Sequence, residues 1–207
     1  MKQLTFVIEV DRCIGCKGCQ LACKLENRIA LGPGRNKVCT IGPVGTFPDL
    51  QMYFLTTMCQ QCEEPYCSEV CPTAACYKSD LDGIIYIDPD MCINCGSCRD
   101  HCPYGCIIEN KEMRISDKCD LCADSRAKGE EPACVRNCSG SALHFGDIND
   151  PESDVSKLLK ETAEEYIYSL RDEGNKPTVK YILKNDKWID VLPQECIEHS
   201  CFGKGRF

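Results

Sequence analysis

The sequence lacks the features that mark several common classes of protein. It contains one Trp and three His among 207 residues, so we expect a modest aromatic core. The paired His and Cys ligands of a Rieske-type centre are absent. No apolar run approaches the roughly 18 residues that a membrane-spanning helix needs. We therefore expect no direct membrane span.

Motifs of enzyme active sites are also missing. No GxGxxG motif or phosphate-binding loop follows a strand, and Gly32-Pro33-Gly34 lacks the Lys-Ser/Thr of a P-loop. No Ser/His/Asp arrangement is suggested. We therefore expect a non-catalytic protein with no catalytic site of its own.

An excess of basic residues is absent as well. The 24 Lys and Arg against 32 Asp and Glu give a formal charge of −8, and an acidic surface disfavours nucleic acid as a partner. The first ten residues hold one Lys, a Glu and no long apolar segment, unlike a signal peptide. The expected location is the cytoplasm, with export or membrane association through a partner as the alternative.

Cysteine, in contrast, is abundant: the chain has 21, and sixteen fall into four groups of four. The first and third groups read C-x2-C-x2-C-x3-C: Cys13, Cys16, Cys19 and Cys23, and Cys92, Cys95, Cys98 and Cys102. The second reads C-x2-C-x4-C-x3-C and the fourth C-x2-C-x11-C-x3-C: Cys59, Cys62, Cys67 and Cys71, and Cys119, Cys122, Cys134 and Cys138.

These spacings predict iron–sulfur clusters. Three thiolates at i, i+3 and i+6 can bind three corners of one cube, while the fourth cysteine ligates a different cluster. Sixteen thiolates, at four per cluster, predict four [4Fe–4S] clusters and electron transfer as the function. Disulfides would need an oxidising compartment. A structural zinc site is complete at four ligands and has no use for the cysteine at i+6, although zinc would be reasonable for the second or fourth group alone.

Other residues near the groups have less specific interpretations. Five cysteines lie outside them, and we expect small buried residues or idle thiols: Cys39, Cys76, Cys106, Cys196 and Cys201. Cys76 and Cys106 could line a cluster. The charged residues that flank the groups could tune cluster potentials, but a solvated face is the favoured interpretation for each: Lys17, Lys24, Arg99, His101, Lys118 and Arg136.

The four groups form an internal duplication. Apolar strands that end in Asp precede the first and third groups, at Val7–Asp11 and Ile84–Asp88. The second and fourth groups share a Glu-Glu-Pro phrase, at Glu63–Cys67 and Glu130–Cys134. The alternation predicts an α+β fold of two ferredoxin-like lobes related by pseudo-two-fold symmetry, over residues 1–149.

Secondary structure is predicted in outline. Strands are expected at Leu4–Val10, Ile84–Asp88, Arg114–Ile115 and Leu143–Phe145. Short helices are expected near Cys19–Asn27, Cys67–Cys71, Cys98–Cys102 and Cys134–Cys138. The segment 28–55, rich in Gly and Pro, is expected to be a connecting loop.

The remaining residues, 150–207, are expected to form a C-terminal extension of helix and strand that packs on the lobes or on a partner. Asp150 is a candidate N-cap with Pro151 at the first helical position. Apolar residues then recur at helical intervals over 150–171, and Thr178–Leu183 alternates like a strand.

The combined motifs resemble the iron–sulfur subunits of the dimethyl-sulfoxide-reductase family of molybdopterin oxidoreductases, over residues 4–183. Besides the four groups, the resemblance is carried by Cys71-Pro72-Thr73, Asp82-Gly83-Ile84, Cys102-Pro103-Tyr104-Gly105, Phe145-Gly146-Asp147 and Asn149-Asp150-Pro151. Two positions depart from the family pattern. Ser139 stands where Pro is common and Cys106 where Ala is usual, and neither removes a ligand.

The resemblance implies that the first group pairs with the fourth, in one lobe, and the second with the third, in the other. The four implied ligand sets are Cys13, Cys16, Cys19 and Cys138; Cys119, Cys122, Cys134 and Cys23; Cys59, Cys62, Cys67 and Cys102; and Cys92, Cys95, Cys98 and Cys71. Spacing alone leaves sequential pairing open, in which the first group pairs with the second and the third with the fourth.

The resemblance also implies a large catalytic partner that carries molybdopterin with molybdenum or tungsten. The chain would relay single electrons between that subunit and a membrane anchor subunit, a ferredoxin or another soluble carrier. A free-standing polyferredoxin that shuttles electrons among several enzymes is the alternative.

Overall fold

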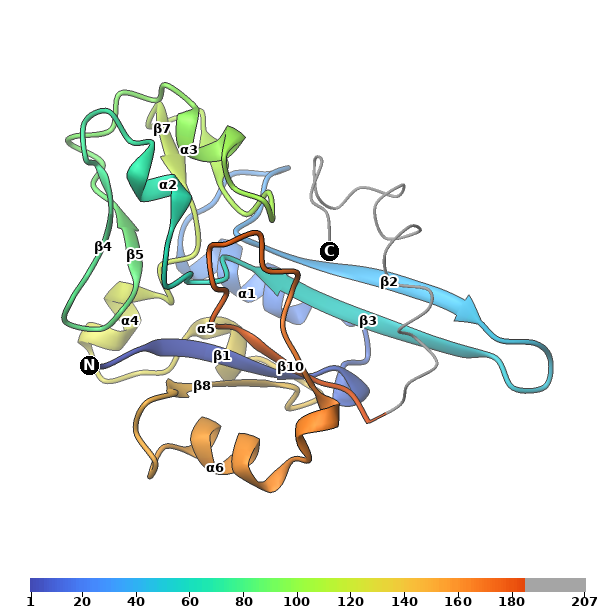
Figure 1. The fold of residues 1–207 in the computed structure, drawn as a ribbon. Helices are drawn as coiled ribbons and strands as arrows, with labels where there is room; N and C mark the ends of the chain where they lie inside the picture. The colour runs from blue at the N-terminus through green and yellow to red at the C-terminus, as the bar shows by residue number, and fades with distance from the viewer. Residues whose placement is uncertain (185–207) are drawn as a thin grey trace.

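The structure, a computed structural model, describes residues 1–184 of the chain. Figure 1 shows a mixed α/β fold of small sheets and short helices. Cys196 and Cys201, together with the rest of the predicted extension beyond residue 184, lie outside the described residues.

The largest sheet joins the two ends of the described chain. Its four strands lie in the order β8-β1-β10-β9, with bounds β8 Leu143–Asp147, β1 Leu4–Glu9, β10 Lys180–Ile182 and β9 Ile167–Tyr168. β1 pairs antiparallel with β8 and parallel with β10. The strands of the C-terminal segment are therefore part of the same sheet as the N-terminal strand.

β1 is buried on both faces. Side chains of a strand point alternately to opposite faces, and here each face is covered: Val7 packs with Val155 of helix α6 (Asp154–Glu161), while Phe6 and Ile8 belong to the main core. This double coverage explains why Leu4 through Ile8 are all buried.

Helix α6 is shorter than the sequence predicts. Ser153, not Asp150, caps it by accepting a hydrogen bond from the Ser156 N–H (3.2 Å). The helix ends at Glu161 and is followed by a 3-10 turn, η2 (Glu164–Tyr166), and by β9. The predicted helix over 150–171 is wrong beyond Glu161 because Ile167 pairs with Ile182 of β10.

The predicted loop at 28–55 is also wrong. It contains most of a long hairpin, β2 (Asn36–Val44) and β3 (Gln51–Met58), which reaches away from the rest of the fold (Figure 1). Val38, Ile41 and Leu55 on this hairpin are buried. Gly45 and Pro48 lie in the turn between the two strands, and Gly42 and Pro43 lie at a register shift within β2, where they do not prevent pairing on either side.

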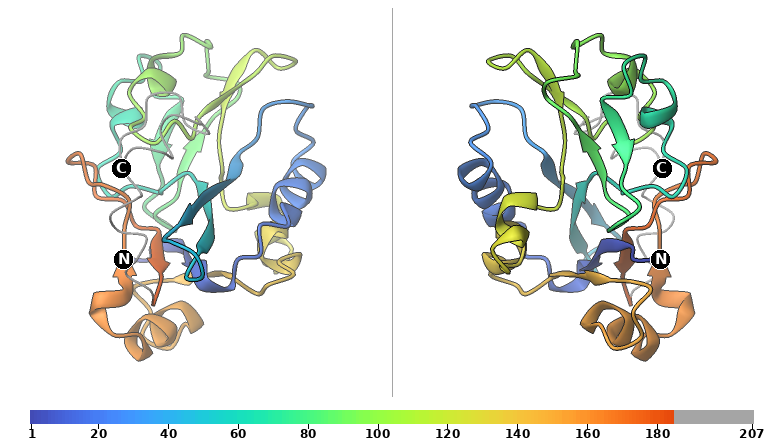
Figure 2. Two further views of the ribbon diagram at one scale, coloured as in Figure 1. Left: turned by 90° about the vertical axis from the view of Figure 1, so that its right-hand side faces the viewer. Right: turned by 90° about the vertical axis from the view of Figure 1, so that its left-hand side faces the viewer.

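The region that holds the second and third cysteine groups is built from two small hairpins at the opposite end of the molecule from α6 (Figure 2). Their strands are β4 Cys76–Lys78 with β5 Ile85–Ile87, and β6 Ile108–Asn110 with β7 Ile115–Asp117. The short helices α2 (Tyr66–Glu69) and α3 (Ser97–Asp100) pack beside each other here.

In the other half, α1 (Gly18–Glu26) lies against α5 (Ala133–Arg136), as both views of Figure 2 show. The one-turn helix η1 (Val10–Arg12) links β1 to the loop before α1, and α4 (Ala123–Ala127) precedes α5. Helices α1 and α5 begin within one residue of the positions that cysteine spacing predicted, whereas η1 and α4 were not predicted. The pseudo-two-fold relationship of the lobes stays a prediction.

Candidate iron–sulfur centres

The packing of α1 against α5 brings the first and fourth groups together. The charges of three neighbouring thiols help to raise the pKa of Cys19: those of Cys13, Cys138 and Cys16. We call these four residues quartet A. Burial raises the pKa of Cys19 to about 11, so without metal this thiol is protonated at neutral pH, and iron binding must displace its proton.

Quartet B consists of Cys23, Cys119, Cys122 and Cys134. These four thiols line a common small cavity. All four residues are buried, and burial raises the pKa of Cys23 to about 12. Cys23 comes from α1, and the other three come from the fourth group.

Quartet C consists of Cys59, Cys62, Cys67 and Cys102. The pKa of Cys62 is raised to about 12, mainly by burial and also by the charges of the Cys59, Cys102 and Cys67 thiols. The pKa of Cys102 falls to about 6, chiefly because it hydrogen-bonds with Cys106. A thiolate is the form of cysteine that ligates metal.

Quartet D consists of Cys71, Cys92, Cys95 and Cys98, which line a second small cavity. Among the described residues, no three His, Cys, Asp or Glu side chains converge as they would on one metal ion. In quartets B and D the thiols instead surround a space. The donor set fits a cubic cluster, in which four separate irons each take one thiolate.

Hydrogen-bond donors point at the sulfur atoms. Backbone N–H groups donate to Sγ of Cys71, Cys92 and Cys138, from Cys76 (3.3 Å), Ser116 (3.5 Å) and Ala142 (3.2 Å). Two amides add side-chain donors: Asn175 Nδ2 lies 2.9 Å from Cys62 Sγ, and Asn27 Nδ2 lies 3.7 Å from Cys122 Sγ. Donors of this kind stabilise negative charge on cluster sulfurs and so influence reduction potentials.

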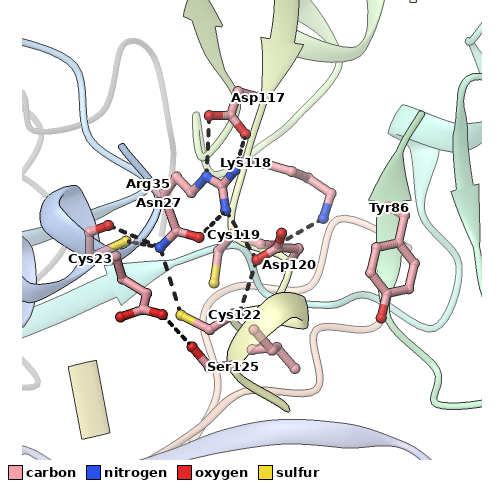
Figure 3. A network of polar contacts seen from close by, with 12 residues as sticks. Cys23, Asn27, Arg35, Tyr86, Asp117, Lys118, Cys119, Asp120, Cys122 and Ser125 are labelled. Carbon is pink, nitrogen blue, oxygen red and sulfur yellow. Dashed lines mark hydrogen bonds and ion pairs between the residues drawn. The ribbon is translucent and has the colours of Figure 1, made fainter. Parts of the chain in front are cut away.

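Arg35 holds a partly buried ionic network beside quartet B (Figure 3). Its guanidinium pairs with Asp117 (2.8 Å) and Asp120 (3.0 Å) and donates to Oδ1 of Asn27 (2.8 Å). The same Asn27 amide donates to the carbonyl of Cys23 (2.9 Å). Arg35 therefore orients an amide that donates to a cysteine sulfur, a role that no motif in the sequence indicates.

Lys118 corrects one expectation. The favoured interpretation placed it on a solvated face, but only 3% of its surface is exposed. Burial acts to lower its pKa, but the charges of Cys59, Cys67 and Cys119 outweigh burial, and the pKa is raised. The sequence places Lys118 next to Cys119 but does not indicate that thiols of a second quartet also lie near it.

Three of the five cysteines outside the groups are described, and all three are buried: Cys39, Cys76 and Cys106. Cys76 lines the cavity of quartet D. Cys106 donates through Sγ to the carbonyl of Met58 (2.9 Å). Their burial agrees with the interpretation as small core residues.

A glycine beside quartet A offers a test of how closely the backbone must approach it. Gly15 has φ +66°, and a Cβ there would lie 2.5 Å from the Phe54 ring. Gly15→Ala should lose the iron of quartet A, about four of about sixteen atoms per chain. Gly32→Ala is the matched control: φ is +99° but nothing lies within 4 Å, so only backbone strain of about 1–2 kcal/mol is expected. Full iron content in Gly15→Ala would contradict the expectation.

The Asn175 amide predicts a shift of potential. Asn175→Leu removes the hydrogen bond to Cys62 while keeping the shape of the side chain. The midpoint potential of a cluster at quartet C should fall by about 59 mV, a tenfold change for a one-electron couple. EPR-monitored titration measures it, with Asn149→Leu as control because that amide donates only to Met1 O. An unchanged potential would show that the bond has no influence on the cluster.

A search of residues 1–184 finds no helix with the length and apolar character of a membrane span.

Similarity to known proteins identifies the family to which the site belongs. A family model described as "4Fe-4S dicluster domain" matches residues 50–148. The matched segment contains quartet C, quartet D, three residues of quartet B and Cys138 of quartet A.

Whole proteins match over more of the sequence. A polysulfide reductase chain of Wolinella succinogenes is 40% identical, over 76% of this sequence and 83% of its own. A protein of Halobacterium salinarum named as a dimethyl sulfoxide reductase iron–sulfur subunit is 36% identical, over 88% and 79%. A sulfite dehydrogenase subunit of Allochromatium vinosum is 33% identical, over 94% and 89%. With the cysteine pattern and the fold, these similarities show that the chain belongs to the family of iron–sulfur subunits of dimethyl-sulfoxide-reductase-type molybdopterin oxidoreductases.

Proposed function

We propose that this chain relays single electrons through four [4Fe–4S] clusters, to or from a molybdopterin catalytic subunit that carries molybdenum or tungsten. The observation that carries the proposal is the arrangement of sixteen cysteine thiols in four sets of four that follow one another through the molecule. Each bound cluster would supply one-electron chemistry. The chain's residues would hold the clusters, shield them and set their potentials.

The sequence of the four sets along the path is A, B, C, D. The charge of the Cys19 thiol, in quartet A, contributes to the raised pKa of Cys134 in quartet B. Thiol charges from both B and C raise the pKa of Lys118. The charge of Cys67, in quartet C, contributes to the raised pKa of Cys98 in quartet D. Each set therefore neighbours the next, which supports the proposed pairing of first group with fourth and second with third.

The two ends of this path lie at the surface, and its middle does not. Cys16 of quartet A and Cys95 of quartet D are exposed, whereas every cysteine of quartet B is buried. Exposed Ile side chains adjoin both ends, Ile14 at 61% and Ile93 at 65%. Electrons would enter at one end and leave at the other, where a catalytic subunit and a second carrier or membrane anchor subunit would dock.

Purification of the native protein under anaerobic conditions tests the function. We expect it to copurify with a large subunit that contains molybdenum or tungsten, and to carry about sixteen irons per chain. A monomer that contains the iron, has no such partner and reduces unrelated enzymes would instead support a free-standing polyferredoxin. Cell fractionation of the same material would distinguish a cytoplasmic complex from one exported or held at a membrane through its partner.

A further inference from the structure

Lys118 lies between the two central quartets, where it is held by backbone groups. It follows β7 and directly precedes Cys119, and its ammonium donates to the carbonyl oxygens of Ile85 and of Cys119 (3.0 Å). Figure 3 shows its side chain starting next to Cys119 and extending toward Tyr86 of β5. Both carbonyls belong to well-buried residues, so the position of the charge is fixed.

No carboxylate balances this charge within the described part of the chain. Ten ion pairs occur there, and none includes Lys118. Arg35, a partly buried cation nearby, pairs with two aspartates. A buried, unpaired ammonium is strongly unfavourable unless other negative groups compensate for the loss of water. Lys118 therefore needs a negative neighbour other than a carboxylate.

Thiols of two different quartets are the neighbours available. The charges that act on Lys118 come from Cys59 and Cys67 of quartet C and from Cys119 of quartet B, with Cys76 contributing less. Four thiolates around a cube with a charge of 2+ give a site of 2−, so each loaded quartet supplies the negative charge that Lys118 lacks.

A second buried side chain keeps both quartets in place around the ammonium. Gln61, between Cys59 and Cys62 in sequence, donates to the carbonyl of Cys119 (2.9 Å) and accepts from the N–H of Ile85 (2.9 Å). These are the same two residues whose carbonyls bind Lys118. Gln61 is fully buried. The loop of quartet C, β5 and the loop of quartet B thus meet at one point.

We propose that Lys118 is the shared counter-charge of the two central clusters, and that it raises the reduction potential of both. The proposal rests on the proposed function, because it requires clusters at quartets B and C. When a central cluster accepts one electron from its neighbour, its site changes from 2− to 3− and the donor site loses one negative charge. Lys118 keeps its proton, and no proton moves.

The physical basis is the low effective dielectric around buried charges. A fixed positive charge attracts the 3− site more than the 2− site, and the difference is larger in the interior than at a solvated surface. Burial by itself disfavours the more highly charged reduced state. Lys118 opposes that effect at the two sites that have the least access to water, so the middle of the path remains accessible to electrons entering from the exposed ends.

The test compares Lys118→Met with wild type in the purified full-length protein or its complex, by EPR-monitored titration with dithionite. We expect both central clusters to shift to lower potential by at least a tenfold change in the redox equilibrium, about 59 mV for a one-electron couple. Clusters at quartets A and D should shift less. Lys118→Arg, which keeps the charge, should restore both potentials toward those of wild type.

Lys78→Met is the matched control. The ammonium of Lys78 also donates to a carbonyl of a cluster loop, that of Cys62 (3.0 Å), but it is only half-buried. Water screens such a charge, so its removal should shift quartet C less than Lys118→Met does and leave quartet B unchanged.

The possible outcomes separate the two proposals. Full iron content with unchanged potentials in Lys118→Met overturns the counter-charge and leaves the electron-transfer function standing. Wild-type protein without iron and without an EPR signal after reduction overturns the function itself.

If Lys118→Met fails to load the central clusters, Lys118→Gln and Lys118→Arg decide. Loading by Arg but by neither neutral variant supports the counter-charge, and failure of Arg as well would show that Lys118 acts only in packing.

Discussion

Protein stripped of all its iron will lose its cooperative unfolding transition. The main core contains cysteines of every quartet, including Cys19, Cys59, Cys98 and Cys134, among a limited number of aliphatic side chains. In the loaded protein, sulfur–iron bonds would join segments that are far apart in sequence. Because a site of this kind is not preformed in an unfolded chain, the free energy of metal binding is also free energy of folding.

Circular dichroism and calorimetry during heating, before and after anaerobic chelation, measure this effect. The loaded protein should melt in one sharp transition, and the iron-free protein should show a broad, non-cooperative change. Return of iron and sulfide should restore the sharp transition, which excludes chemical damage during chelation. A cooperative melt of fully iron-free protein would mean that the small sheets and the apolar core hold the fold without clusters.

The combined variant Cys23→Ala/Cys134→Ala should lose no more iron than either single variant. If both residues bind the cluster of quartet B, each single change removes the same cluster, about four of about sixteen irons. Sequential pairing would place Cys23 with the second group and Cys134 with the third, so that the double variant would lose about eight. Non-additive losses are the expected sign of residues that act on one site.

Iron analysis with EPR of the reduced protein measures this prediction. Cys39→Ala is the control, since Cys39 is equally buried but lies outside the four groups, and it should retain all of its iron. Both quartet B variants should also stop electron transfer from dithionite to the partner enzyme, because the missing cluster lies in the middle of the path. Transfer at the wild-type rate would contradict the A, B, C, D path.

The spacing of cysteines determined the parts of the site that depend on local geometry. It predicted the loops and the short helices that begin within them, so that α1, α2, α3 and α5 lie within a few residues of their expected positions. Ligand spacing is a local property, because three thiolates on one short loop must reach one cluster whatever the rest of the fold is.

Long-range pairing decided what the sequence did not reveal. Ile167 continued an apolar pattern typical of a helix, but it forms a strand because β10 offers it a partner. Likewise, the Gly and Pro of residues 28–55 indicated a loop, whereas β2 and β3 pair along most of their length. Propensity is a weak signal where tertiary pairing competes with it.

The side chains that surround the sulfur atoms are the clearest case. Asn175 reaches Cys62 across 113 residues of sequence, and Arg35 reaches Asp120 across 85. Nothing next to either residue in the chain indicates these contacts. The residue types at the centres could be read from their spacing, whereas the burial of Lys118 and the donors that set charge around the sulfurs exist only once distant segments have packed together.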